Sequence, residues 1–71
     1  MDFTEALEQM KAGKRLAFPS MEKGSYYEYH CLGKDDNVDY FRHIGPIMTM
    51  SYIRANLRMQ LATDWYIVTE N

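Results

Sequence analysis

The sequence predicts an α+β fold, namely a small twisted antiparallel sheet of four to five strands with an N-terminal helix and a short helix before the last strand. Three observations predict it: a helical apolar pattern opens the chain, residues 25–32 alternate with a period of two, and turn-forming residues separate the later apolar segments. With 71 residues, 46% of them hydrophobic, the chain is long enough for one core and too short for two. Residues 1–71 are therefore expected to form a single domain.

The first expected element is an amphipathic helix. Asp2 can be its N-cap, and Glu5 lies three residues later, where a capping box places a glutamate. Gly13 is expected to end the helix, because glycine readily adopts the left-handed conformation that follows a helix. The inward side should consist of apolar residues at helical spacing: Phe3, Ala6, Leu7 and Met10.

Two strands are expected next. Residues 16–18 form a short apolar strand that Pro19 closes, since proline has no N–H for the ladder. In residues 25–32, successive side chains point to opposite faces of the sheet. The core face is expected to carry Tyr27, Tyr29 and Cys31, and the other face Tyr26, Glu28 and His30.

A hairpin is expected in the middle of the chain. Turn-forming residues at 33–37 predict that the strand at 25–32 reverses into an antiparallel strand at 38–44. Gly45 and Pro46 then break the chain. Residues 47–53 can be interpreted as a strand or as a helix N-capped by Ser51, and we favour the strand.

The last elements are a short helix and a strand. Asn56 is expected to cap a helix at 57–62, with Leu57 and Leu61 facing inward at a spacing of four. Residues 65–68 should form the final strand, and their β-branched and aromatic content suits the inside of a sheet. Trp65 is interpreted as a residue of the core, and the polar residues 69–71 are expected at the surface.

Charge and composition limit the classes of function. Ten acidic and eight basic residues give a net charge of −2, too little positive charge for a cationic nucleic-acid binder. The longest apolar runs have only a few residues, far fewer than the roughly 20 that a membrane span needs. Cys31 is the only cysteine, so no intrachain disulfide is expected, and we interpret it as a small buried hydrophobe. With no leader pattern at its start, the chain is expected to be cytoplasmic.

The titratable residues do not form a recognisable catalytic or metal-binding pattern. His30 and Cys31 are adjacent on a strand and should point to opposite faces. Glu28 and His30 share a face, where an acid–base couple and a solvated neighbour pair are both open interpretations, and we favour the second. His43 has no partner at ligand spacing. We therefore expect no enzyme activity, no metal and no cofactor.

Aromatic and thioether side chains are abundant, with six Tyr, three Phe, one Trp and six Met. They can be explained by a dense core and an oligomer interface, where Tyr and Met are enriched. They can also be explained by a concave site at a subunit junction, in which Tyr26 and Tyr52 stack on a flat ring. Since so small a domain is marginally stable alone, a homo-oligomer is expected in both cases.

Both ends of the chain resemble a known family. The segments FTEAL at 3–7, MKAGK at 10–14 and LATDW at 61–65 are similar to the second Thoeris anti-defence family, small proteins of phages and prophages. The middle departs from the family, because residues 18–24 stand where members carry a basic residue and a Trp. Tyr52 takes the place of a second family Trp and keeps an aromatic face there.

The resemblance implies a phage-encoded, homo-oligomeric sponge that captures a cyclic ADP-ribose type of immune signal in the host cytoplasm without degrading it. It implies that Tyr26 and Tyr52 stack on the base, while Arg54 and Asn56 bind phosphate and ribose hydroxyls. The expected ligand-binding set also includes Met21. An alternative function is a protein-binding inhibitor of a bacterial defence enzyme such as a CRISPR effector, motivated by the altered residues 19–24.

Overall fold

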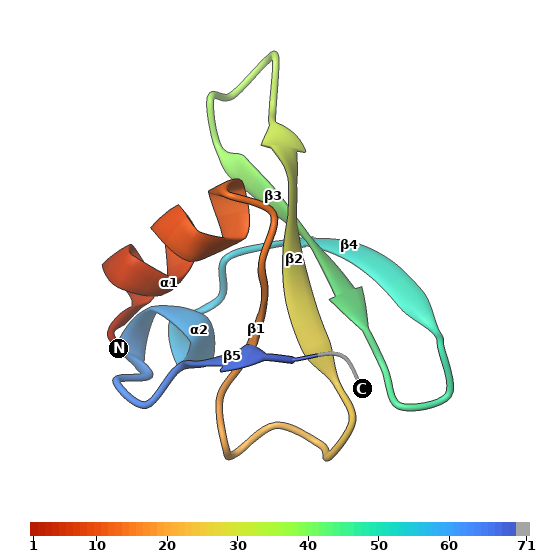
Figure 1. The fold of residues 1–71 in the computed structure, drawn as a ribbon. Helices are drawn as coiled ribbons and strands as arrows, with labels where there is room; N and C mark the ends of the chain where they lie inside the picture. Colours follow the sequence, from red (N-terminus) through yellow and green to blue (C-terminus); the bar gives the residue numbers. More distant parts are fainter. Residues whose placement is uncertain (70–71) are drawn as a thin grey trace.

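The computed structural model describes residues 1–69 and has the α+β architecture that the sequence predicts (Figure 1). Two helices and five strands follow one another in the order α1, β1, β2, β3, β4, α2, β5. Their bounds are Phe3–Lys11 for α1, Arg15–Ala17 for β1, Tyr26–Leu32 for β2, Asp39–Ile44 for β3, Met50–Arg54 for β4, Leu57–Leu61 for α2 and Tyr66–Val68 for β5.

The start of α1 confirms the predicted capping box. The Asp2 side chain accepts a hydrogen bond from the Glu5 backbone N–H at 2.9 Å, and Glu5 Oε1 accepts one from the Asp2 N–H at 3.3 Å. Two otherwise unpaired N–H groups are therefore satisfied. Gly13 follows the helix with a φ of +95°, as expected of a residue that ends it.

The five strands form one antiparallel sheet in the order β4-β3-β2-β1-β5. Leu16 pairs with Tyr27, and Tyr27 with His43, so these side chains share one face. Both helices cover that face, because Ala6 and Met10 of α1 and Met59 of α2 join the core cluster. The other residues of this cluster are Leu16, Phe18, Tyr27, Phe41 and Trp65.

The opposite side of the sheet carries no helix among residues 1–69, and we call it the open face. Glu28 pairs with Arg42, and Arg42 with Tyr52, which places these three side chains together on it. Tyr26 lies on the same face, two residues before Glu28 on β2. The sheet therefore has one apolar side and one side of charged and aromatic residues.

The predicted strand at 47–53 is wrong at its start, because β4 begins only at Met50. Residues 45–49 instead form the turn between β3 and β4, closed by the Gly45 N–H that donates to the Thr49 carbonyl at 2.8 Å. Met48 has a φ of +64°, a left-handed conformation that interrupts a strand. The alternation of side chains extends by chance into the turn at residues 47–49, so the sequence pattern alone placed the start of β4 too early.

The inward orientation predicted for Leu57 and Leu61 is also wrong. Both are exposed, at 69% and 68%, whereas Met59 is fully buried. The two leucines are one helical turn apart on one side of α2, and Met59 lies about 200° around the helix from Leu57, on the opposite side. Since α2 has a single buried residue, spacing could not identify its inner side.

Two further predictions about burial are corrected. The final strand β5 is not inside the sheet but at its edge, where among the described residues 1–69 it pairs only with β1 and leaves Tyr66 and Ile67 exposed. Cys31 is exposed rather than buried. The pairing of β2 with β3 shifts between Tyr29 and Cys31, so a bulge at His30 ends the alternation there.

Candidate ligand-binding site

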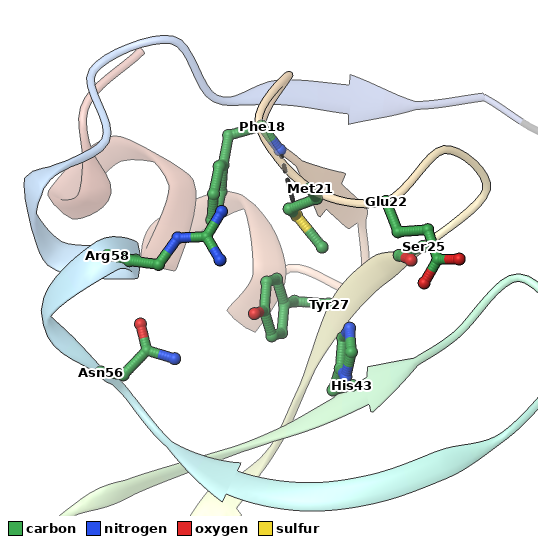
Figure 2. A pocket seen from close by; sticks show the side chains of 8 residues that line it. All are labelled: Phe18, Met21, Glu22, Ser25, Tyr27, His43, Asn56 and Arg58. Atoms are coloured by element: carbon green, nitrogen blue, oxygen red, sulfur yellow. Dashed lines mark hydrogen bonds between the residues drawn. The ribbon is translucent and has the colours of Figure 1, made fainter.

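A pocket of about 220 Å³ opens on the helix side of the sheet (Figure 2). Strands β2 and β3 supply its floor through Tyr27 and His43, which are paired in the sheet. The segment between β1 and β2 and the start of α2 supply its walls. The lining residues are Phe18, Met21, Glu22, Ser25, Tyr27, His43, Asn56 and Arg58.

Three rings form the apolar part of the pocket. The Tyr27 ring centroid lies 4.9 Å from that of His43 and 6.2 Å from that of Phe18, and the Phe18 and Tyr27 planes are only 17° apart. Phe18 in turn packs edge-on against Trp65, with 4.8 Å between centroids. Trp65 is buried in the core and contacts both Phe18 and Tyr27, so its packing fixes the positions of these two pocket rings.

Burial raises the pKa of the Tyr27 hydroxyl, and the nearby Arg58 charge and Asn56 side chain act in the opposite direction. Tyr27 is therefore neutral at physiological pH, and its hydroxyl can donate or accept a hydrogen bond. In Figure 2 the hydroxyl lies on the side of the ring that faces Asn56. A polar group of a ligand could bind there.

Arg58 places a positive charge at the mouth of the pocket. One of its terminal nitrogens donates to the Ser20 carbonyl at 3.1 Å and to Ser20 Oγ at 3.3 Å, and its guanidinium carbon lies 5.8 Å from the Phe18 ring centroid. These contacts orient the guanidinium but include no carboxylate. Its charge is therefore available to an anion, although Glu22 also lines the pocket.

Asn56 and Met21 each have a structural role besides lining the pocket. Asn56 is the N-cap of α2, since its Oδ1 accepts the Met59 backbone N–H at 2.9 Å, which confirms the predicted cap. The Met21 sulfur accepts the Phe18 backbone N–H at 3.3 Å, and this contact closes the turn that begins at Phe18. Both contacts fix the backbone on which the pocket is built.

The open face is organised around Glu28. Its carboxylate lies 3.3 Å from Arg15 Nε and 3.5 Å from an Arg42 terminal nitrogen, so it forms ion pairs with two arginines. His30 instead packs against Tyr52, with 4.5 Å between ring centroids. Glu28 is thus held by arginines and His30 by a ring, an arrangement that does not form an acid–base couple.

Tyr26 and Tyr52 lie on different strands of the open face, and an arginine packs on each ring. The guanidinium carbon of Arg15 is 5.0 Å from the Tyr26 centroid, and that of Arg42 is 5.9 Å from the Tyr52 centroid. A shallow hollow of about 360 Å³ adjoins this cluster, lined by Gly13, Lys14, Arg15, Glu28 and Val68.

Arg54 is engaged by a neighbouring network. A terminal nitrogen lies 2.8 Å from Asp36, its Nε donates to the Tyr40 hydroxyl at 3.2 Å, and Tyr40 donates to Asp36 at 3.0 Å. The Asp36 pKa is lowered mainly by the Val38 backbone N–H, then by Tyr40 and the Arg54 charge. Arg54 thus ties β4 to the turn between β2 and β3.

The structure divides the residues that the sequence proposed for ligand binding. Asn56 and Met21 lie in the pocket, whereas Tyr26, Tyr52 and Arg54 lie on the open face. Sequence reasoning missed Arg58, Tyr27 and His43 as pocket residues. The sequence did contain a signal for Arg58, because this residue follows the predicted helix cap Asn56 by two positions. The pairing of Tyr27 with His43 could not be predicted, because it depends on the register between β2 and β3.

Within residues 1–69 there is no group of three or more His, Cys, Asp or Glu side chains placed to hold a metal ion. The same part of the chain contains no helix of the length and apolarity that crossing a membrane requires. Comparison of the chain with protein-family models and with curated proteins finds no match.

Proposed function

We propose that this chain is a binding protein of the phage anti-defence type, which sequesters a cyclic nucleotide-derived immune signal of the cyclic ADP-ribose class without cleaving it. The observation that carries the proposal is the pocket in which a neutral tyrosine, a histidine and an arginine converge. Rings that can contact a base lie next to a guanidinium that can bind a phosphate, and nucleotides present both groups. The resemblance of residues 3–7, 10–14 and 61–65 to that family supports the same ligand class.

The volume of the pocket limits how much of a ligand it can enclose. Its 220 Å³ is below the roughly 300–1,000 Å³ of pockets that enclose a whole drug-sized ligand. We infer that it holds one moiety, a base or a phosphate with its ribose, while the rest of the ligand lies outside. Tyr27 and Phe18 would contact the base, and Arg58 with Asn56 would bind phosphate and ribose oxygens.

Calorimetry with cyclic ADP-ribose tests the proposal, followed by heat release and mass spectrometry of the ligand. We expect saturable binding and recovery of the intact cyclic molecule, which separates sequestration from cleavage. Absence of binding by cyclic ADP-ribose and by its ring-linkage isomers would refute the proposal, and a linearised product would refute the sequestering mechanism.

Two arginine variants locate the site. Arg58→Gln should weaken binding roughly 10- to 150-fold, because a hydrogen bond to a charged group contributes about 1.5–3 kcal/mol. Arg54→Gln is the matched control, since Arg54 is also exposed but lies on the open face and pairs with Asp36. If Arg54→Gln abolishes binding and Arg58→Gln does not, the ligand binds the open face and the pocket assignment is wrong.

A protein-binding inhibitor is the second candidate, and one observation favours it. Ile47 and Met48 are exposed at the tip of the turn between β3 and β4, where apolar side chains are suited to contact another protein. An Ile47→Ser, Met48→Ser variant that loses anti-defence activity while it retains ligand binding would favour this candidate over sequestration.

A further inference from the structure

The two ends of the pocket carry opposite charges. In Figure 2, Arg58 and Asn56 lie on one side of the Tyr27 ring, and Glu22 and Ser25 lie on the other side. We call the first pair of residues the Arg58 end and the second pair the Glu22 end. A ligand that fills the pocket therefore meets a positive charge at one end and a negative charge at the other.

Two turns hold the backbone of the Glu22 end. The Met21 N–H donates to the Phe18 carbonyl at 3.0 Å, and the Ser25 N–H donates to the Glu22 carbonyl at 3.0 Å. The first turn ends directly before Glu22, and the second begins at this residue. The chain is therefore fixed on both sides of Glu22 where its side chain lines the pocket.

The polar groups of the Glu22 end have no partners in the part of the chain that the structure describes. Within residues 1–69 the Glu22 carboxylate forms no ion pair, and the Ser25 hydroxyl forms no hydrogen bond. Ser25 is only 7% exposed, and a hydroxyl without a partner is costly at a buried position. Both groups are therefore available to a ligand in the pocket.

We propose that the Glu22 end binds the amino-bearing edge of an adenine base, and that Glu22 selects an exocyclic amino group over a carbonyl oxygen. This inference rests on the proposed function and names the part of the ligand that enters the pocket. An ionised carboxylate only accepts hydrogen bonds, so it pairs with an N–H group and repels a carbonyl oxygen. Adenine carries its amino group beside the acceptor N7. Glu22 accepts from the amino group, and the Ser25 hydroxyl donates to N7.

The charges of the two ends also determine how the nucleotide is oriented. In adenine the amino group lies on the opposite side of the base from the ribose, to which the phosphates are attached. When the amino group is at the Glu22 end, a phosphate lies toward the guanidinium of Arg58. The reverse orientation would bring a phosphate against the Glu22 carboxylate, and like charges repel. The moiety inside the pocket is therefore the base, which contacts the rings of Tyr27 and Phe18.

Titration calorimetry with two ligands tests this selection. The ligands are cyclic ADP-ribose and its hypoxanthine analogue, cyclic inosine diphosphate ribose, in which an oxygen replaces the exocyclic nitrogen. The wild type should bind cyclic ADP-ribose roughly 10- to 150-fold more tightly, the range for one hydrogen bond to a charged group. Glu22→Gln should bring this ratio to about one, because a glutamine amide both accepts and donates and therefore pairs with either ligand.

Two other variants are the controls. Glu8→Gln removes the same charge from an exposed glutamate of α1 that does not line the pocket, so the ratio of the two affinities should remain that of the wild type. Arg58→Gln should weaken both ligands by the same factor, because both carry the same phosphates. The fluorescence of the buried Trp65 during urea unfolding verifies that each variant is folded.

The outcomes separate this inference from the proposed function. A wild-type ratio near one, or a ratio that Glu22→Gln leaves unchanged, would overturn the selection by Glu22, while tight binding of cyclic ADP-ribose would still support sequestration. Equal tightening of both ligands by Glu22→Gln would mean that the carboxylate acts only as a repelling charge, which also overturns the selection. Absence of binding by both ligands would refute the proposed function and this inference together.

Discussion

Replacement of Asn56 by alanine should destabilise the fold through the short helix α2. Asn56 Oδ1 accepts the Met59 backbone N–H at 2.9 Å, and the Met59 side chain is fully buried beneath that turn. Alanine cannot accept this hydrogen bond, so a partly buried N–H loses its partner. The same helix carries Arg58 to the pocket, and the substitution therefore affects both the fold and the proposed site.

The magnitude follows from these two contacts. Loss of an N-cap side chain costs about 1 kcal/mol when the helix remains folded. If α2 unwinds, exposure of Met59 adds roughly 1.5–3 kcal/mol. We expect the free energy of unfolding to fall by about 1 kcal/mol, which corresponds to a melting temperature lower by about 4–8 °C in a domain of this size.

Urea unfolding followed by the fluorescence of Trp65, the only tryptophan, measures this change. All variants are compared at one protein concentration, because association would make stability depend on concentration. Asn56→Asp is the matched control: it keeps the cap and should remain within about 0.5 kcal/mol of the wild type, yet its negative charge beside Arg58 should weaken binding of an anionic ligand. Equal stability of Asn56→Ala and the wild type, or equal destabilisation by alanine and aspartate, would refute the capping argument.

Two further changes test other contacts. Trp65→Phe removes the Nε1–H that donates to the Met59 carbonyl at 3.2 Å in the core. Urea unfolding followed by circular dichroism should show that the free energy of unfolding falls by about 1–3 kcal/mol. An unchanged unfolding midpoint would contradict the importance of this hydrogen bond. The Tyr29 hydroxyl donates a hydrogen bond to Asp39 at 2.8 Å. This bond is the largest cause that raises the pKa of Tyr29 to about 12, and burial and the Asp39 charge contribute less. Since the folded pKa exceeds the ordinary value of 10, the contribution of Tyr29 to stability is complete below pH 10 and is lost as the pH rises towards 12. Spectrophotometric titration should therefore show a phenol transition near pH 12 that Tyr29→Phe removes, and its persistence in the variant would contradict the assignment.

Local signals in the sequence predicted most of the elements. Asp2 with Glu5 marked the start of α1, Asn56 marked the start of α2, and the turn-forming residues 33–37 marked the hairpin of β2 and β3. Each of these features depends on hydrogen bonds between residues at most a few positions apart. Such interactions are encoded in spacing, which a single sequence displays.

Predictions that depended on distant partners were less successful. The sequence showed that 65–68 favours a strand, but pairing with β1 placed β5 at the edge rather than inside the sheet. It showed that Leu57 and Leu61 share a side of α2, but the packing of Met59 decided that this side faces solvent. The alternation in β2 indicated a core position for Cys31, and the bulge opposite β3 moved it to the surface.

By itself, the sequence determined the α+β class, the caps of both helices and the burial of Trp65, because local hydrogen bonds and hydrophobicity decide these features. Only the tertiary structure decided which side chains share a site. The sheet register brings Tyr27 beside His43, and α2 brings Arg58 to them, whereas Tyr26, Tyr52 and Arg54 remain on the other face. The physical reason is that a pocket is formed by strands and a helix distant in sequence, and one residue of shift in register would exchange its two faces.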